Sequence, residues 1–393
     1  MYNLLVILFA KVLNFFANIL CKILHKDNGN MLGKIVKKLS PDILKSIKID
    51  CPVIAVTATN GKTTTNNAIR YMLEQNGKKV VSNREGNNME TGIITTLIKS
   101  CTLTGKIKAD FVIFEVDESY VPIVFKKIPL NTLVVLNFFR DQLDRNGEVE
   151  SLILKINEFL KTYEGNLVLN NDDPNVARLG RANENNKNVY YFSVDKYKFA
   201  TEEQSEAGEG KFCPFDKTRL EYEYYQYSHI GKFKCPKCGY GEENLYTKVE
   251  NVDLDEKTFK EDGITYEFLA NNIYTIYNYA AVISVAKLYD LDAKEAIKTF
   301  KLDNGRAENV KINGCETIIN LAKNPTGANV SLRTLNEDKE EKELLFVLND
   351  NSADGRDVSW IWDINFNVQN VTRIVPAGTR AYDMAIRIKT SGF

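Results

Sequence analysis

A glycine, a lysine and several threonines lie where a predicted strand passes into a predicted helix. Residues 57–65 read Thr-Ala-Thr-Asn-Gly-Lys-Thr-Thr-Thr, after the apolar run Pro-Val-Ile-Ala-Val. Residues 66–75 have the composition and apolar spacing of a helix. Such a turn offers a phosphate the N–H groups of a helix N-terminus and the charge of Lys62, while the Thr63 hydroxyl can bind Mg²⁺. The chemistry indicated is nucleotide binding.

The loop departs from the complete phosphate-loop pattern, which has glycine where this chain has Val56. A glycine-containing turn capped by threonine is the alternative interpretation. Strand, Gly-Lys-Thr and helix nevertheless follow one another in the order that phosphate binding needs. We therefore expect a nucleotide to be bound by Thr59, Asn60, Gly61, Lys62, Thr63 and Thr64.

Three carboxylates, Glu115, Asp117 and Glu118, follow the apolar residues 111–114. Carboxylate oxygens are the ligands that Mg²⁺ prefers, and ligands bind at the carboxyl ends of parallel strands. An acidic cap on the next helix would give the same pattern. Because the Gly-Lys-Thr loop is present in the same chain, a metal site is favoured.

Two cysteine-containing turns, at 213–216 and 235–238, flank an aromatic, hairpin-like sequence. Two Cys-x-x-Cys turns at this separation would close a tetrahedral zinc site, but here Asp216 replaces one cysteine. A zinc-free insertion held by hairpin packing is the alternative. We expect structural Zn²⁺ to be bound by Cys213, Cys235, Cys238 and a fourth ligand, which is Asp216 or His229.

The overall composition limits the other possibilities. A chain of 393 residues is too long for one ordinary core, so we expect two or three domains. Its 51 Lys and Arg are balanced by 52 Asp and Glu, which leaves no basic excess for binding nucleic acid. Seven scattered cysteines form no disulfide framework for a chain of this size.

Strands and helices alternate over residues 52–194, which predicts an α/β fold with a mostly parallel sheet and helices on both faces. A second, smaller α/β pattern begins after Val310. The predicted domains are 1–50, an amphipathic helical segment; 51–305, the ATP-binding domain with a Cys-rich insertion at about 201–245; and 306–393, a C-terminal α/β domain. The predicted strands of the main sheet are 53–56, 79–82, 110–115, 132–137, 166–170 and 188–193.

The N-terminal segment raises the question of a membrane. Its uninterrupted apolar run, Leu4 to Ala10, is far shorter than the ~20 residues that span a bilayer. We expect an amphipathic helix that packs on the domain or lies on a membrane surface.

The sequence Thr-x-Thr-Asn-Gly-Lys-Thr-Thr resembles the ATP loop of the Mur ligase superfamily, which usually has glycine at the position of Ala58. By this resemblance Glu118 is the magnesium ligand, together with Thr63. Asn278, in Tyr-Asn-Tyr-Ala-Ala, belongs to the helix that contacts adenine, and Arg306 belongs to the interdomain linker that reaches the nucleotide.

Several segments are similar to the MurT family, the Mur-ligase-like subunits of lipid II isoglutaminyl synthases. They are the Arg-Asp-Gln-Leu-Asp-Arg run at 140–145, the cysteine-rich insertion, Ala-Lys-Asn-Pro at 322–325 and the aspartate-rich loop at 349–360. Against this family the C-terminal domain is expected to be incomplete.

This resemblance implies an ATP-dependent ligase that amidates the D-glutamate α-carboxylate of lipid II in the cytoplasm, at the inner face of the membrane. Ammonia would come from a GatD-like glutamine amidotransferase partner. The implied catalytic residues are Lys62, Glu118 and Asp357. Asp357 is expected to orient the histidine of the partner, with Asp350 and Asp354 of the same loop as the alternatives. Two alternatives remain: another Mur-type amino-acid ligase, like a folylpolyglutamate synthase, and a degenerate nucleotide-binding scaffold.

Overall fold

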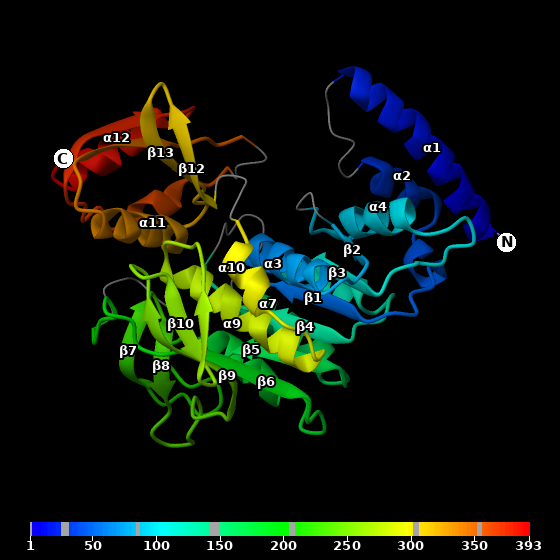
Figure 1. Ribbon diagram of the computed structural model, residues 1–393, viewed down its shortest axis with the longest axis horizontal. Helices are drawn as coiled ribbons and strands as arrows, with labels where there is room; N and C mark the ends of the chain where they lie inside the picture. The colour runs from blue at the N-terminus through cyan, green and yellow to red at the C-terminus, as the bar shows by residue number, and fades with distance from the viewer. Residues whose placement is uncertain are drawn as a thin grey trace.

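A nine-stranded sheet forms the centre of the molecule, in the order β11-β10-β9-β6-β5-β4-β1-β3-β2 (Figure 1). The computed structural model describes residues 2–24, 31–83, 87–140, 149–203, 209–301, 306–351 and 356–393. The strands are β1 (Val53–Thr57), β2 (Val80–Ser82), β3 (Phe111–Glu115), β4 (Thr132–Val135), β5 (Asn166–Asn170), β6 (Val189–Val194), β9 (Leu245–Asp253), β10 (Thr258–Glu261) and β11 (Ile264–Glu267). Strands β1 to β6 and β9 pair in parallel, and β10 and β11 add an antiparallel edge. The predicted mostly parallel α/β fold is confirmed.

Strand β1 shows how the sheet separates two cores. Val53 and Ala55 point into one apolar cluster, and Ile54 and Val56 point into the other, because successive side chains of a strand face opposite sides. The first cluster is covered by α2 (Met31–Leu39), α4 (Glu90–Ser100) and α7 (Val149–Leu160). The second is covered by α3 (Lys62–Gln75), α9 (Ile273–Leu288) and α10 (Lys294–Thr299). Helices therefore lie on both faces, as predicted.

The N-terminal helix α1 (Tyr2–Leu24) packs on the first of these cores. Its side chains Val6, Ile7 and Ala10 are buried there, so the predicted amphipathic helix does pack on the domain. Among the helices that the structure describes, none is long and apolar enough to cross a membrane.

The cysteine-rich insertion lies between β6 and β9. It contains the antiparallel hairpin of β7 (Glu221–Tyr227) and β8 (Ile230–Lys234), which matches the hairpin expected between the two cysteine-containing turns.

The C-terminal part has its own apolar core, which includes Leu332, Leu348 and Met384. Its elements are β12 (Arg306–Ile312), β13 (Cys315–Asn320), α11 (Pro325–Glu337), β14 (Lys342–Val347), the 3₁₀ helix η4 (Ser359–Asp363), β15 (Val371–Ala377) and α12 (Ala381–Thr390). The second α/β pattern is thus present, while the domain boundaries at 50/51 and 305/306 stay predictions.

Candidate active site

The predicted phosphate loop connects β1 to the N-terminus of α3. Gly61 has φ 86°, a left-handed conformation that glycine adopts without strain. A Cβ at this position would lie 2.7 Å from Oδ1 of Asn278, so the close approach of the loop to α9 favours a residue without a side chain. Helix α3 then begins at Lys62, and the N–H of Thr65 donates to the Gly61 carbonyl over 2.9 Å. The sequence prediction placed the start of α3 four residues too late, because threonines are poor helix formers.

Asn137 fixes the loop from the side. Its side-chain Oδ1 accepts the N–H of Asn60 at 2.9 Å, its Nδ2 donates to the Asn60 carbonyl at 3.0 Å, and its own carbonyl accepts the Thr59 N–H at 3.0 Å. The strand predicted over 132–137 ends at Val135, because the backbone of residue 137 bonds the loop. The loop geometry is therefore held before any nucleotide arrives, which preorganises it for a phosphate.

Lys62 and Glu118 form a buried ion pair beneath the loop. Nζ of Lys62 lies 3.0 Å from Oε2 of Glu118, and it also donates to the Ala58 carbonyl. Burial alone would lower the pKa of Lys62, but the charges of Glu118, Glu115 and Asp117 outweigh it and raise that pKa. The lysine is therefore a permanent cation at neutral pH, as electrostatic stabilisation of a phosphoryl group requires.

The carboxylates after β3 fit a divalent cation. Burial raises the pKa of Glu118 despite the attraction of Lys62. Oε2 of Glu115 is buried and has no hydrogen-bond partner among the described residues, although Oε1 accepts from Asn88 at 3.2 Å. A buried carboxylate oxygen without a donor is costly, and a cation would remove that cost. The donor set at this strand end therefore suits Mg²⁺.

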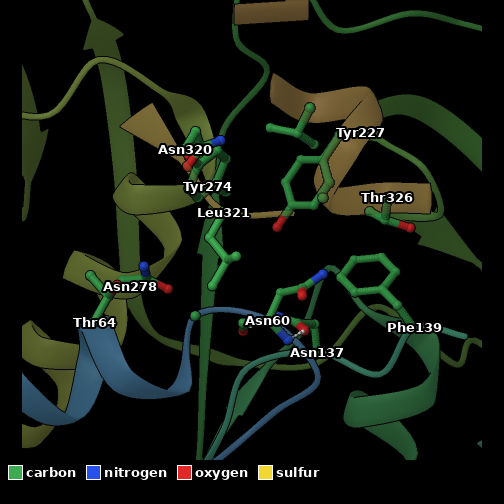
Figure 2. A pocket seen from close by; sticks show the side chains of 13 residues that line it. Asn60, Thr64, Asn137, Phe139, Tyr227, Tyr274, Asn278, Asn320, Leu321 and Thr326 are labelled. Carbon is green, nitrogen blue, oxygen red and sulfur yellow. Dashed lines mark hydrogen bonds between the residues drawn. The ribbon is translucent and has the colours of Figure 1, made fainter. Parts of the chain in front are cut away.

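A pocket of about 100 Å³ opens above the loop, between the main sheet and the C-terminal part (Figure 2). Asn60 of the loop and Asn324, the N-cap of α11, are joined by two amide hydrogen bonds of 3.1 and 3.4 Å. Asn324 also caps α11, because its Oδ1 accepts the Gly327 N–H at 2.8 Å. The lining residues are Asn60, Gly61, Thr64, Asn137, Phe139, Tyr227, Tyr274, Asn278, Asn320, Leu321, Thr326, Gly327 and Val330.

The structure brings most of the predicted nucleotide-binding residues together. Asn278 lines the pocket beside Asn60, Gly61 and Thr64, and Lys62 lies directly beneath them. Arg306 begins β12, where its backbone pairs with Asn320, but its side chain lies outside the described part. The Asp-Gln-Leu-Asp-Arg part of the predicted 140–145 segment and Asp354 of the C-terminal loop also lie outside the described residues.

Several residues in the pocket or beside it were not predicted to contact the nucleotide, among them Asn137, Asn324 and Tyr227. Asn137 is the last residue of a predicted strand, and a polar residue at the carboxyl end of a strand was the signal that could have identified it. Asn324 stands 264 residues from Asn60, and Tyr227 comes from the cysteine-rich insertion, so neither could be placed without the tertiary fold.

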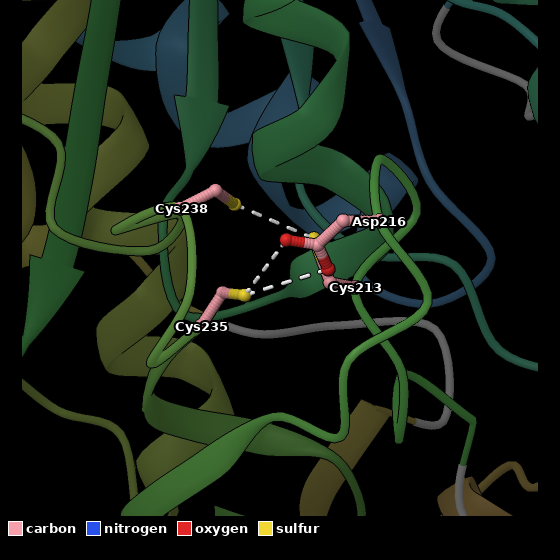
Figure 3. Close-up of side chains that lie close together, drawn as sticks. All are labelled: Cys213, Asp216, Cys235 and Cys238. Carbon is pink, nitrogen blue, oxygen red and sulfur yellow. Dashed lines mark hydrogen bonds between the residues drawn. The ribbon is translucent and has the colours of Figure 1, made fainter.

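The four expected zinc ligands do converge (Figure 3). The ligand atoms of Cys213, Asp216, Cys235 and Cys238 all lie within 4.8 Å of one another. The sulfurs of Cys213 and Cys238 are 3.6 Å apart, and Cys235 Sγ lies 3.5 Å from Asp216 Oδ2. Two sulfurs bound tetrahedrally at about 2.3 Å from one zinc ion would be separated by roughly 3.8 Å, so the spacing fits.

His229, the other expected candidate for fourth ligand, lies elsewhere. It is buried, with Nε2 3.3 Å from Oδ1 of Asp173 and its ring 4.9 Å from that of Phe139. This places the tip of the β7–β8 hairpin against the loop that contacts Thr59. Asp216 is therefore the candidate for the fourth position.

We expect close to one zinc ion per chain in protein purified without chelator, measured by elemental analysis. Cys235→Ser should lower the zinc content and destabilise the insertion, because it removes one of four converging ligands. Nucleotide affinity should be retained, and Cys315→Ser on the exposed hairpin strand β13 is the matched control. Intact, folded protein without zinc would support the zinc-free alternative.

Asp172 lies in a buried network between the insertion and α9. Its Oδ1 accepts the Ser193 hydroxyl at 2.6 Å, and its Oδ2 accepts the Tyr277 hydroxyl at 2.8 Å and the Val194 N–H at 3.0 Å. Burial raises the pKa of Asp172 to about 6 in spite of these bonds. The folded chain therefore binds this proton more tightly than the unfolded chain does.

A raised carboxyl pKa means that this group stabilises the fold at acidic pH and that the contribution is lost as pH rises through 6. Between pH 5 and 7 the loss should be roughly 1 kcal/mol. Asp172→Asn keeps the shape but cannot ionise, so its free energy of unfolding should fall less than that of the wild type over this range. Denaturant unfolding at both pH values measures the difference, and identical pH dependence in the two proteins would contradict it.

Comparison with known proteins first defines the class. A family model described as the Mur ligase middle domain matches residues 56–236. Among solved structures, a pseudomurein peptide ligase type C from Methanothermus fervidus shares the fold with a TM-score of 0.69 and 24% sequence identity. The match covers 93% of this chain and 75% of that one. The fold is that of the Mur ligases.

Sequence comparison identifies the family within the Mur ligases. The family model described as MurT ligase C-terminal matches residues 321–393. The chain is 34% identical to the lipid II isoglutaminyl synthase (glutamine-hydrolyzing) subunit MurT of Staphylococcus aureus strain COL. That match covers 93% of this chain and 83% of the relative. It is also 30% identical to the subunit of the same name from Streptococcus pneumoniae strain R6. That match covers 92% of this chain and 82% of the relative. The chain belongs to the MurT family, as its motifs predicted.

Proposed function

We propose that this chain is the ligase subunit of a lipid II isoglutaminyl synthase. ATP phosphorylates the α-carboxylate of the D-glutamate in the lipid II stem peptide, which gives an acyl phosphate and ADP. Ammonia then attacks the acyl carbon, phosphate leaves, and the product carries an isoglutamine amide. The observation that best supports this proposal is the buried Lys62 at a preformed Gly-Lys-Thr loop in a chain of the MurT family.

Lys62 and the N-terminus of α3 position and neutralise the transferred phosphoryl group. Phosphoryl transfer needs charge stabilisation and alignment more than covalent help from the protein. Lys62 Nζ donates to Glu118 and to loop carbonyls, so its charge lies at the loop. When the lysine turns to a phosphate, Glu118 loses its cation and can accept another.

Thr63, Glu118 and the neighbouring Glu115 would hold Mg²⁺, which supplies charge neutralisation on the ATP phosphates. Glu115 was expected among the carboxylates at this strand end, and its buried oxygen without a donor supports its inclusion. The Asn60–Asn324 bonds show that the C-terminal part already contacts the loop. A closed interface of this kind protects an acyl phosphate from hydrolysis.

The source of ammonia is the second part of the proposal. We infer a GatD-like glutaminase as the partner subunit, since the named relatives are glutamine-hydrolyzing synthase subunits. Because lipid II is anchored in a membrane, we place the reaction in the cytoplasm, at the inner face of the membrane.

The direct test combines the chain with ATP, Mg²⁺, lipid II, glutamine and a GatD-like glutaminase, and follows the product by mass spectrometry. In the expected product, an amino group replaces the hydroxyl of one carboxyl group of lipid II, and ADP forms in the same reaction. Addition of an amino acid in place of ammonia would identify a different Mur-type ligase. Complete absence of ATP turnover, with the folded protein present, would favour the degenerate scaffold.

A further inference from the structure

Helix α1 has two apolar faces over residues 5–12, and among the residues that the structure describes only one of these faces is covered. On the inner face Val6, Ile7 and Ala10 are at most 6% exposed. Polar contacts fasten the same side: Asn3 Nδ2 donates to Ser46 Oγ at 2.5 Å, and the Ser40 hydroxyl donates to Asn3 Oδ1 at 3.0 Å. The orientation of the helix on the domain is therefore fixed.

The outer face carries exposed large apolar side chains, four of which lie within residues 5–12. Leu5 is 59% exposed, Leu8 46%, Phe9 52% and Val12 49%. Their spacing of three, four and seven residues puts them in one continuous stripe along the helix. We call these four residues the outer stripe.

An exposed stripe of this size requires an explanation. A helix that is apolar on all sides is ordinarily buried on all sides, and contiguous exposed apolar surface marks an interaction site. In Figure 1, α1 lies along the edge of the molecule, away from the C-terminal part and from the nucleotide-binding loop at the start of α3. The stripe is therefore not part of the active site.

The charge around the helix indicates what covers the stripe. Residues 1–50 contain eight lysines and three aspartates, whereas the whole chain has a net charge of −1. No acidic residue occurs within α1, and Lys34, Lys38 and Lys45 are exposed on α2 and on the 3₁₀ helix that follows it. A segment that combines a basic excess with an apolar stripe complements a surface that is both apolar and anionic.

We propose that α1 docks the protein on the surface of an anionic lipid bilayer, with the helix axis in the plane of the membrane. The outer stripe enters the boundary between headgroups and acyl chains, and lysines of the same N-terminal segment contact anionic headgroups. The docking itself needs no catalysis. Its benefit rests on the proposed function, because it would hold the ligase beside a membrane-anchored substrate.

Vesicle flotation tests the docking without lipid II, ATP or a partner subunit. Vesicles of phosphatidylglycerol and phosphatidylcholine are compared with vesicles of phosphatidylcholine alone. Wild-type protein should float with the anionic vesicles, and the bound fraction should fall as salt screens the lysines. Leu8→Glu combined with Phe9→Glu should weaken binding by at least tenfold, since both side chains leave the acyl boundary.

Leu154→Glu is the matched control, because Leu154 is 57% exposed on α7 and outside the stripe. The milder pair Leu8→Ser and Phe9→Ser, with thermal unfolding of each variant, separates lost binding from lost folding. Equal flotation of the stripe variants and wild type would overturn the proposal. So would a wild type that ignores vesicles but self-associates through the stripe, as measured by light scattering.

These outcomes are distinct from those of the amidation assay. Vesicle binding with no amidation would count against the proposed reaction only, whereas amidation of detergent-solubilised lipid II without vesicle binding would count against the docking only.

Discussion

Lys62→Ala is expected to reduce ATP-dependent amidation by on the order of 10² to 10³ in rate, the cost of losing one preorganised electrostatic contact. The side chain is buried below the phosphate loop, and neighbouring carboxylates raise its pKa, so it carries its charge throughout the physiological range. Water cannot replace that charge easily in a buried position, because solvation there is poor. Steady-state ADP formation with the complete set of substrates measures the effect.

Stability must be followed in the same experiment. Removing Lys62 leaves Glu118 buried without its cation, and an unpaired buried charge is strongly destabilising. The double variant Lys62→Ala with Glu118→Gln removes both charges, and should regain stability but not activity. Lys79→Ala, an exposed lysine before β2, is the matched control. Turnover like that of the wild type in folded Lys62→Ala would contradict the assignment of the ATP site.

The parts of the site that the sequence predicts are those made by neighbouring residues. An apolar run followed by Gly-Lys-Thr and a helix pattern specifies β1, the loop and α3, because each depends on local conformation and periodicity. The cysteine-containing turns are local in the same way, and their spacing predicted the cluster that the structure shows. The fourth ligand was left open, because distance along the chain does not reveal that His229 turns toward Asp173.

The rest of the site depends on contacts between distant segments. From the sequence alone, Asn137 could belong either to the strand or to the loop that follows it. Its hydrogen bonds to Asn60, which are visible only in the folded structure, assign it to the phosphate-loop contacts. The unpaired oxygen of Glu115 likewise requires knowledge of every surrounding donor. The contact of Asn324 with Asn60 depends on how the C-terminal part packs, which no local pattern encodes.

The aspartate-rich loop before η4 carries a partly exposed carboxylate, that of Asp357. A glutaminase cysteine needs a histidine base, and that histidine needs a third group to orient it, usually a carboxylate. Asp357 is partly exposed, its Oδ1 accepts the Ser359 N–H at 2.8 Å, and hydrogen bonds from Ser359 together with the charge of Arg140 lower its pKa. It is therefore ionised and available at the surface. Asp350 instead bonds the Thr379 hydroxyl at 2.8 Å and pairs with Arg380.

We propose that Asp357 orients the histidine of the glutaminase across the subunit interface, so that ammonia is released only in the assembled complex. Asp357→Asn retains the bond to the Ser359 N–H but removes the charge, so glutamine-driven amidation should fall by roughly two orders of magnitude or more. Amidation supplied with external ammonium should persist, because Lys62, Glu118 and the phosphate loop are unchanged. The ratio of the two activities is the measurement, since a purely structural cap would change both equally.

Asp350→Asn is the matched control, because Asp350 belongs to the same loop but is bonded within the C-terminal part. It should leave the ratio of glutamine-driven to ammonium-driven amidation unchanged. Binding of the glutaminase subunit to each variant, followed by size-exclusion chromatography, separates lost assembly from lost orientation. Equal loss of both activities in Asp357→Asn would assign this residue to ligase chemistry or folding. If neither activity falls, the third group of the glutaminase is another residue, and the coupling of ammonia release to assembly must have a different origin.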